Sequence, residues 1–473
     1  MFDSKEEVCA EPIEVQLGRP TDEWPLAAKA RLRQGDRRTE INFRFTRTAP
    51  VEPPLVQSAM LPLALVPAMK LGSPLRIEGS IDDALPEGAA RFQEIFSSWY
   101  PEYTPVPIEA STVTGKKKTS ENDKRGVGLF FSGGVDSMYS LLKHRDEITH
   151  AIFVHGCDIP LQERIYRERI SRHLQAAADD FGVKLVEVET NLLDFSNLFG
   201  HWGYHYHGCG LAAIAILLSG TLRKVLIASS DPYSLIVPWG SSYITDPLWS
   251  SAALELVHDG SECDRLDKTR IVANNETALK YLRVCFENPT KGQNCGRCEK
   301  CYRTMIGLRL CQALEHCPAF NEPLDLNRML ETETVLREAG QMRAWRILRE
   351  EATRQNTDSE LIAALDALFD RAVFYDMVRN FSQNKKEITA MASWKESLPK
   401  FRSVIYDSLR ENDPSWFAGK TLKWLPEIRD RVFHRLWAND RHWLSERCRS
   451  ARWNRLLSRF QKRRKRPGNV SKS

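Results

Sequence analysis

An apolar run, a glycine-containing turn and a helical pattern follow one another near the start of the central part of the chain. Residues 127–131 are apolar, too few for a helix, and preceded by the charged segment 121–125, so they predict a buried strand. Residues 138–142 then place apolar side chains at helical spacing. The stretch between them is Ser132-Gly133-Gly134-Val135-Asp136-Ser137. The sequence therefore predicts a strand, a tight turn and a helix in direct succession.

This turn has the composition of a phosphate-binding loop. The N-terminus of a helix offers unpaired backbone N–H groups and the positive end of its dipole. Gly133 and Gly134 allow close approach of an anion, Ser132 and Ser137 add hydroxyl donors, and Asp136 can hold a divalent cation between phosphate oxygens. The turn lacks a Gly-Lys-Ser/Thr motif, so it is not a Walker-type loop. The alternative is a tight turn that binds nothing.

Strand and helix patterns continue to alternate beyond the loop. Further strands are predicted at 151–154, 184–188 and 225–228, and helices at 163–181 and 210–218. This alternation predicts an α/β fold with a doubly wound parallel sheet, whose ligands bind beyond the carboxyl ends of the strands.

Three loops therefore become candidates for chemistry, at residues 132–137, 155–158 and 229–246. In the second loop, His155 and Gly156 are predicted to contact a nucleotide. In the third, Asp231 and Asp246 could bind substrate amines or a metal, or could simply form turns.

Four cysteines form the second strong motif. Cys285, Cys295, Cys298 and Cys301 follow the spacing C-x9-C-x2-C-x2-C, which can close a tetrahedral metal site. Zinc is the predicted ion, with an iron–sulfur cluster as the alternative. A closed site with four sulfur ligands is normally structural.

Composition narrows the class of protein. Of 473 residues, 42% are hydrophobic and 27% charged, as in globular proteins, and no apolar run is long enough to cross a bilayer. The first residues lack the apolar core of a secretory signal. Eleven cysteines without such a signal favour a cytoplasmic chain with metal-bound or reactive thiols. Composition does not determine the oligomeric state, and a homo-oligomer is one hypothesis.

Five regions are expected. Residues 1–110 show period-two alternation and predict a β-rich domain with a helix at 88–99. Residues 111–125 are predicted to form a linker, and residues 126–318 the α/β domain. A helical domain is predicted over 319–440 and a basic tail over 441–473. The tail carries twelve Lys and Arg residues against Glu446, so its charge of +11 leaves −6 for the rest of the chain, whose total is +5. An RNA or an acidic partner could bind this tail; a solvated tail is the alternative.

The order of these motifs resembles a known family. The pattern Ser-Gly-Gly-x-Asp-Ser resembles the pyrophosphatase loop (PP-loop) of N-type ATP pyrophosphatases. Together with the stretches 207–212 and 266–272 and the four cysteines, the region 126–310 looks like the 7-cyano-7-deazaguanine synthases of queuosine precursor biosynthesis. The resemblance covers less than half of the chain, and the match is loose at the substrate loop, 229–247.

The resemblance implies the fold of adenine nucleotide alpha hydrolases and a ligase that uses ATP and Mg²⁺, with Zn²⁺ on the four cysteines. ATP would adenylate a carboxylate, ammonia would displace AMP to give an amide, and a second round would give the nitrile. Ser132, Asp136 and Lys268 would act on the phosphates, although Lys268 could equally be a surface lysine.

Two other functions fit the same residues. A sulfur transferase acting on tRNA could use Cys157 or Cys209, although both are better explained as buried small residues. A non-catalytic nucleotide-binding protein could keep the loop as a ligand site. His201, His205 and His207 invite a metal interpretation, but their uneven spacing favours pocket-lining residues.

Overall fold

A computed structural model describes residues 6–17, 19, 22–46, 55–115, 123–235, 237–285, 287, 294–331 and 339–369. The chain divides into two compact units, Met1–Thr357 and Asp358–Ser473. In the second unit the described residues are helical over 359–369, which agrees with the helical domain predicted over 319–440. The rest of that predicted domain and the basic tail lie outside the described residues.

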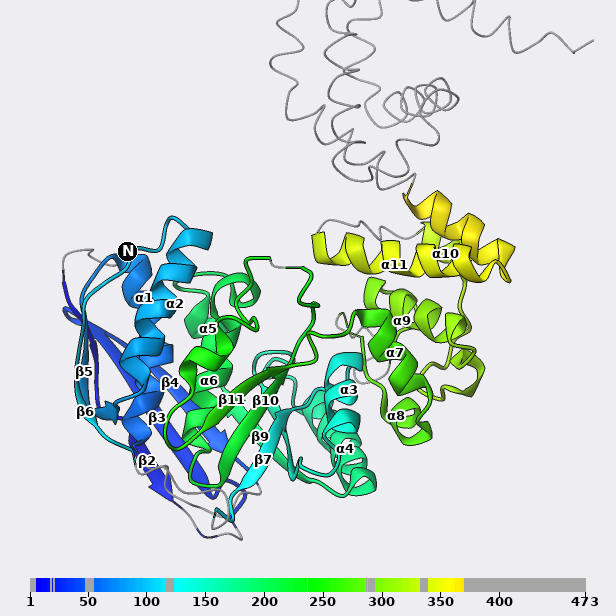
Figure 1. Cartoon of the computed structure of the whole chain (residues 1–473). Helices are drawn as coiled ribbons and strands as arrows, with labels where there is room; N and C mark the ends of the chain where they lie inside the picture. The colour runs from blue at the N-terminus through cyan, green and yellow to red at the C-terminus, as the bar shows by residue number, and fades with distance from the viewer. Residues whose placement is uncertain are drawn as a thin grey trace, which may run out of the picture. The chain divides into compact units, whose positions relative to one another are not determined.

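A mixed, mostly parallel sheet runs through the first unit (Figure 1). Its central strands, in chain order, are β7 (Gly126–Phe130), β8 (His150–His155), β9 (Lys184–Thr190), β10 (Leu222–Ala228) and β11 (Glu255–Asp259). They are mutually parallel and lie in the order β11-β10-β7-β8-β9. The predicted α/β class is confirmed, and β11 is a strand that the sequence analysis missed.

The N-terminal strands continue this sheet beyond β9. Strand β4 (Arg37–Phe45) pairs antiparallel with β9 and with β3 (Leu26–Gln34). The remaining strands are β1 (Val8–Ala10), β2 (Glu14–Leu17), β5 (Leu75–Asp82) and β6 (Ile108–Val113). The β-rich N-terminus was thus predicted, and β6 extends the sheet into the segment predicted as a linker.

Two helices accompany these N-terminal strands. Helix α2 (Leu85–Trp99) starts slightly earlier than predicted, and α1 (Met60–Leu71) was not predicted. Residues 60–69 of α1 are all buried, so apolar side chains surround the helix and leave no 3.6-residue period to detect.

Helices cover both faces of the sheet (Figure 1). On one face lie α1, α2 and α6 (His207–Leu217); on the other lie α3 (Val135–Lys143), α4 (Arg164–Phe181), α7 (Arg265–Ala273), α8 (Glu276–Tyr281) and α9 (Glu299–Leu310). Both faces of the sheet are apolar and need this cover. In β8, Ile152 and Val154 enter the core on one face, and Ala151 and Phe153 enter the core on the other.

Shorter and peripheral elements complete the unit. They are α5 (Leu192–Ser196), α10 (Leu326–Glu331), α11 (Ala339–Gln355) and the helical turns Val56–Ala59, Trp202–Tyr206, Asp246–Trp249 and Leu314–His316. Helices α10 and α11 both lie within residues 319–440, the region predicted to be helical.

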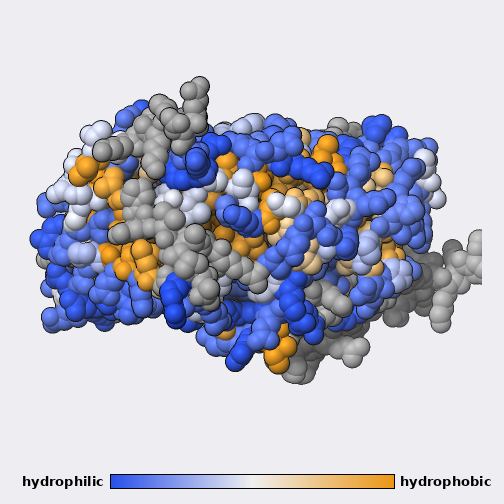
Figure 2. All heavy atoms as spheres, turned by 90° about the horizontal axis from the view of Figure 1, so that it is seen from below, coloured by the Kyte–Doolittle hydropathy of each residue, from blue (hydrophilic) through white to orange (hydrophobic). Residues whose placement is uncertain are grey.

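The surface carries apolar side chains in small groups among hydrophilic ones on the face shown in Figure 2. None of the helices in the described part of the chain has both the length and the apolar composition to span a bilayer.

Candidate functional site

The predicted phosphate loop lies between β7 and α3. Gly134 is the N-cap of α3, and among the described residues no side chain caps its first turn. Gly133 has a φ of +77°, and a Cβ there would lie 3.3 Å from the Tyr281 carbonyl oxygen. The Ser137 hydroxyl is buried and donates to the Gly134 carbonyl, whereas Ser132 is exposed. The loop thus places backbone N–H groups at a helix N-terminus, and Gly133 is required by both angle and space.

Arg283 holds this loop in position. Its backbone N–H donates to the Gly133 carbonyl at 2.8 Å, and its guanidinium donates to the Ser132 carbonyl at 3.3 Å. The same buried guanidinium pairs with Asp158 at 2.8 Å and contacts the Tyr166 hydroxyl at 3.2 Å. Arg283 therefore connects the loops that follow β7 and β8.

Asp136 faces two cations from α7. Its carboxylate lies 2.8 Å from the Arg265 guanidinium and 3.5 Å from the Lys268 ammonium. Lys268 is only 1% exposed and also donates to the Ser229 carbonyl at 2.6 Å. The structure therefore excludes Lys268 as a surface lysine, and it brings this predicted residue to Asp136.

Helix α9 supplies two more cations that the sequence analysis did not identify. Lys300 and Arg303 are three residues apart and share one helical face. The pKa of Lys300 is lowered mainly by the burial of its ammonium group among neighbouring atoms and secondly by the charge of Arg265. The residue as a whole is exposed to solvent. Burial also lowers the pKa of Arg303, against the pull of Glu299, and Arg265 adds to the effect. We call Arg265, Lys268, Lys300 and Arg303 the cation cluster; a bound anion would relieve this crowding of positive charge.

A pocket lies beside the cation cluster, beyond the ends of β10 and β11. Its aromatic walls are Trp99, Trp239 and Tyr243. Ser229, whose carbonyl accepts from Lys268, lines it as well. The pocket and the phosphate loop are therefore neighbours that share the Lys268–Ser229 contact.

Titratable side chains also line this pocket. His258 of β11 contacts the buried Asp246 carboxylate at 2.8 Å through Nδ1, and Asp246 also accepts from the Ser241 hydroxyl at 2.6 Å. Burial lowers the pKa of the pocket-lining His207, although Asp246 opposes the shift. Burial and the nearby charge of Asp136 raise the pKa of Asp231. Of the third-loop candidates, Asp231 lines the pocket and Asp246 lies behind its wall, bonded to the lining residues Ser241 and His258, and His258 was not predicted.

The predicted nucleotide contacts at the end of β8 have structural partners. His155 is buried and its Nε2 lies 2.9 Å from the Glu187 carboxylate. Gly156 has a φ of +96°, and a Cβ there would collide with the Thr190 carbonyl oxygen at 1.9 Å. The nucleotide role of both residues stays a prediction.

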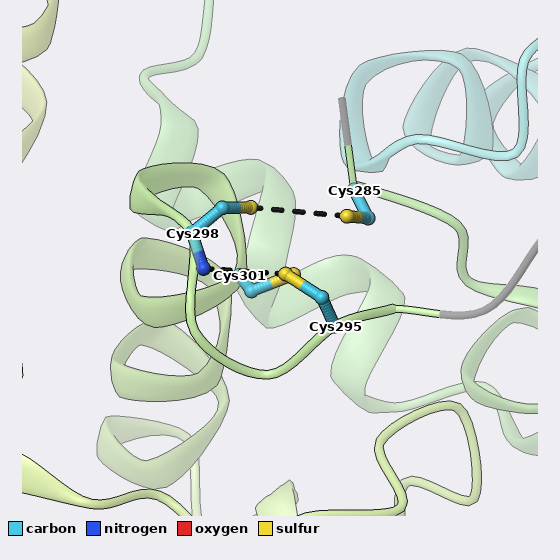
Figure 3. A group of neighbouring side chains, drawn as sticks. All are labelled: Cys285, Cys295, Cys298 and Cys301. Atoms are coloured by element: carbon cyan, nitrogen blue, oxygen red, sulfur yellow. Dashed lines mark hydrogen bonds between the residues drawn. The ribbon is translucent and has the colours of Figure 1, made fainter. Parts of the chain in front are cut away.

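The four predicted metal ligands come together (Figure 3). Their sulfur atoms lie within 4.8 Å of one another, with 3.9 Å between Cys285 and Cys298 and 3.8 Å between Cys295 and Cys301. Four thiolates about 2.3 Å from a tetrahedral zinc ion would lie about 3.8 Å apart. The Cys298 N–H donates to Cys295 Sγ at 3.3 Å, and Gly296 allows the turn with a φ of +66°. This buried cluster fits a metal such as zinc.

Asn294 organises the cysteine cluster, and the sequence analysis missed it. Its Oδ1 accepts from the backbone N–H groups of Val284 and Cys285 at 2.8 and 3.1 Å. Its Nδ2 donates to the carbonyls of Leu282 and Ala319 at 2.9 and 3.0 Å. The only sequence signal for this role is the position of Asn294 immediately before the ligand Cys295.

The clustered histidines take separate roles. His201 Nδ1 accepts from the N–H groups of Gly203 and Tyr204, and His205 Nδ1 accepts from the His201 N–H. His207 lines the pocket. Within the described residues, the cysteine cluster is the only group of three or more side chains placed to hold a metal.

No protein-family model, curated protein or solved structure matches the chain. The site is described by its own geometry. It has a helix N-terminus without a side-chain cap, a carboxylate on its first turn, a cation cluster beside it, and an aromatic pocket joined to the cluster by the Lys268–Ser229 hydrogen bond.

Proposed function

We propose that this protein is an ATP-dependent adenylating ligase that activates a carboxylate for attack by ammonia or an amine, in the manner of 7-cyano-7-deazaguanine synthase. The observation that carries the proposal is the strand order. Numbered from β7, the parallel strands lie in the order 3-2-1-4-5, which is that of a doubly wound sheet. Ligands of such sheets bind where the order reverses, between the first and fourth strands, here β7 and β10. The phosphate loop and the loop from Ser229 both emerge there.

The residues around this point fit a nucleoside triphosphate. The amides of the loop and the cation cluster would bind the phosphates, and Asp136 would hold Mg²⁺ after exchanging its present partners Arg265 and Lys268. Lys268 would then neutralise charge on the departing pyrophosphate. A Mg²⁺-bound pyrophosphate is a good leaving group, which is what carboxylate activation requires.

The aromatic pocket is the proposed site of the carboxylate substrate. Trp99, Trp239 and Tyr243 offer flat apolar surfaces that suit a planar ring such as a deazapurine. The shared Lys268–Ser229 contact keeps such a substrate next to the phosphates. The cysteine cluster has no open coordination position and would serve to fix α9, which begins after Cys298.

The sulfur-transfer alternative receives less support from the thiols. Burial raises the pKa of Cys157 and of Cys209, so neither environment favours the nucleophilic thiolate.

The proposal is tested by product analysis of the purified protein with ATP, Mg²⁺, ammonia and 7-carboxy-7-deazaguanine, with AMP, amide and nitrile separated by mass. AMP together with amide or nitrile supports it. ATP binding without AMP, tested across a panel of carboxylates, would favour the non-catalytic nucleotide-binding alternative.

A further inference from the structure

We infer that His258, oriented by Asp246, accepts the proton that the attacking amine loses when the amide bond forms. This inference rests on the proposed function and assigns the proton-accepting residue of its second step. His258 lies in β11 opposite Ile227 of β10, at the sheet edge where the pocket opens.

The geometry selects the ring nitrogen that would act. His258 Nδ1 lies 2.8 Å from Asp246 Oδ2, and the Asp246 carboxylate is 1% exposed. A buried carboxylate accepts the proton on Nδ1, which fixes the tautomer and leaves the lone pair on Nε2 at the opposite edge of the ring. Because the side chain lines the pocket and is 5% exposed, that lone pair is available to a bound ligand.

Asp246 is itself held in place. It accepts from the Ser241 hydroxyl at 2.6 Å and from the Ser242 N–H at 3.3 Å. The carboxylate also packs against Gly208, where a Cβ would come within 2.3 Å of Oδ1, so this position has no room for a side chain. A carboxylate fixed in this way holds the imidazole in one orientation and one tautomer. His207, the second histidine of the pocket, is a weaker base because burial lowers its pKa.

The step balances without an oxidant or reductant. The nitrogen lone pair attacks the carbonyl carbon of the acyl adenylate and forms the C–N bond. The bond between that carbon and the AMP oxygen breaks with its electron pair, so AMP leaves. The surplus proton on nitrogen passes to His258 Nε2 and from there to water.

The test compares ammonia, which gives the amide, with hydroxylamine, which gives the hydroxamate. Both react with 7-carboxy-7-deazaguanine in wild type and in His258→Asn. Asparagine can keep a donor toward Asp246 but has no group at the position of Nε2. Amide formation from ammonia should fall about 100-fold, the usual size of a general-base contribution. Hydroxamate formation should stay within about 3-fold, because hydroxylamine is a weak base and its adduct is acidic enough to lose the surplus proton directly to water. His316→Asn, an exposed histidine outside the pocket, is the matched control and should leave both rates unchanged.

Two results would overturn the inference. Unchanged amide formation would remove His258 from the step, and an equal loss of hydroxamate and amide in a folded variant would place its effect before amine attack. Absence of AMP in wild type would instead overturn the proposed function, so the two failures are distinguishable.

If His258→Asn does not fold, the wild type provides the test. Amide formation should require a base that hydroxamate formation does not, while Asp231, His207, Tyr243 and Asp246, the other titratable groups around the ring, affect both reactions alike. Identical pH profiles for the two nucleophiles, once each rate is divided by the concentration of unprotonated nucleophile, would refute the inference.

Discussion

The cysteine cluster and the phosphate-loop site differ in how far apart their residues lie along the chain. All four sulfur ligands come from one stretch, 285–301, and the asparagine that orders them lies within it. The phosphate-loop site combines a loop after β7 with cations from α7 and α9 and with a pocket after β10 and β11. A site made from one stretch depends on local geometry, whereas a site made from several elements depends on the whole sheet.

The two sites nevertheless meet in one helix. Cys298 is the N-cap of α9, and Arg303 of the cation cluster lies one turn further along. Folding of the cysteine cluster should therefore also position part of the anion site.

The largest effect is expected for Cys298→Ser. Removing one of four sulfur ligands should release zinc and lower the free energy of unfolding by several kcal/mol, because binding of a structural metal is coupled to folding. Metal analysis and denaturant unfolding measure both effects. Cys311→Ser, a half-buried thiol outside the cluster, is the control, with an expected loss of about 1 kcal/mol or less. Retained zinc and unchanged stability in Cys298→Ser would show that the cluster is not a metal site.

Asp136→Asn should affect chemistry but not the cysteine cluster. Loss of the carboxylate removes the Mg²⁺ ligand, so AMP formation should fall at least about 100-fold. Zinc content and the unfolding midpoint should stay close to wild type. Asp267→Asn is the control, because this exposed carboxylate on α7 pairs with Arg270 instead. Wild-type AMP formation in Asp136→Asn would contradict the loop assignment.

Asn294→Ala should weaken the cysteine cluster from outside its ligand set. It leaves two backbone N–H groups and two carbonyls without their partner, at an expected cost of about 2 to 3 kcal/mol. Denaturant unfolding of the zinc-loaded protein measures this. Asn274→Ala, whose exposed side chain bonds one carbonyl, should cost about 0.5 kcal/mol or less. Equal losses in the two variants would show that Asn294 has no special role.

The same contrast explains what could be predicted. The cysteine ligands and the loop Ser132–Ser137 were identified because their chemistry is contained in contiguous motifs. Strands β7 to β10 were predicted because buried parallel strands are short apolar runs. Helix α1 was missed because burial on all sides removes its period. Lys300, Arg303 and His258 were missed because their role arises only when the sheet brings β11, α7 and α9 to one edge.

The smallest effect concerns Asp231, which tests whether the pocket and the loop are electrostatically coupled. Burial and the charge of Asp136 raise the pKa of Asp231, so the folded protein holds its proton more tightly than the unfolded chain. Its contribution to stability is therefore complete below the ordinary aspartate pKa and is lost as the pH rises through the raised value. Asp231→Asn should remove this pH dependence of stability. The accompanying change in the free energy of unfolding should be smaller than the loss expected for Asn294→Ala.

Unfolding free energies measured from pH 4 to 7 on wild type, Asp231→Asn, Asp136→Asn and the double variant provide the check. If the charge of Asp136 contributes to the shift, the slope assigned to Asp231 should be smaller when Asp136→Asn is already present. Parallel curves for wild type and Asp231→Asn would mean that Asp231 is solvated like a surface carboxylate. The pocket would then be electrostatically separate from the phosphate loop, although the Lys268–Ser229 hydrogen bond would still join the pocket to the cation cluster.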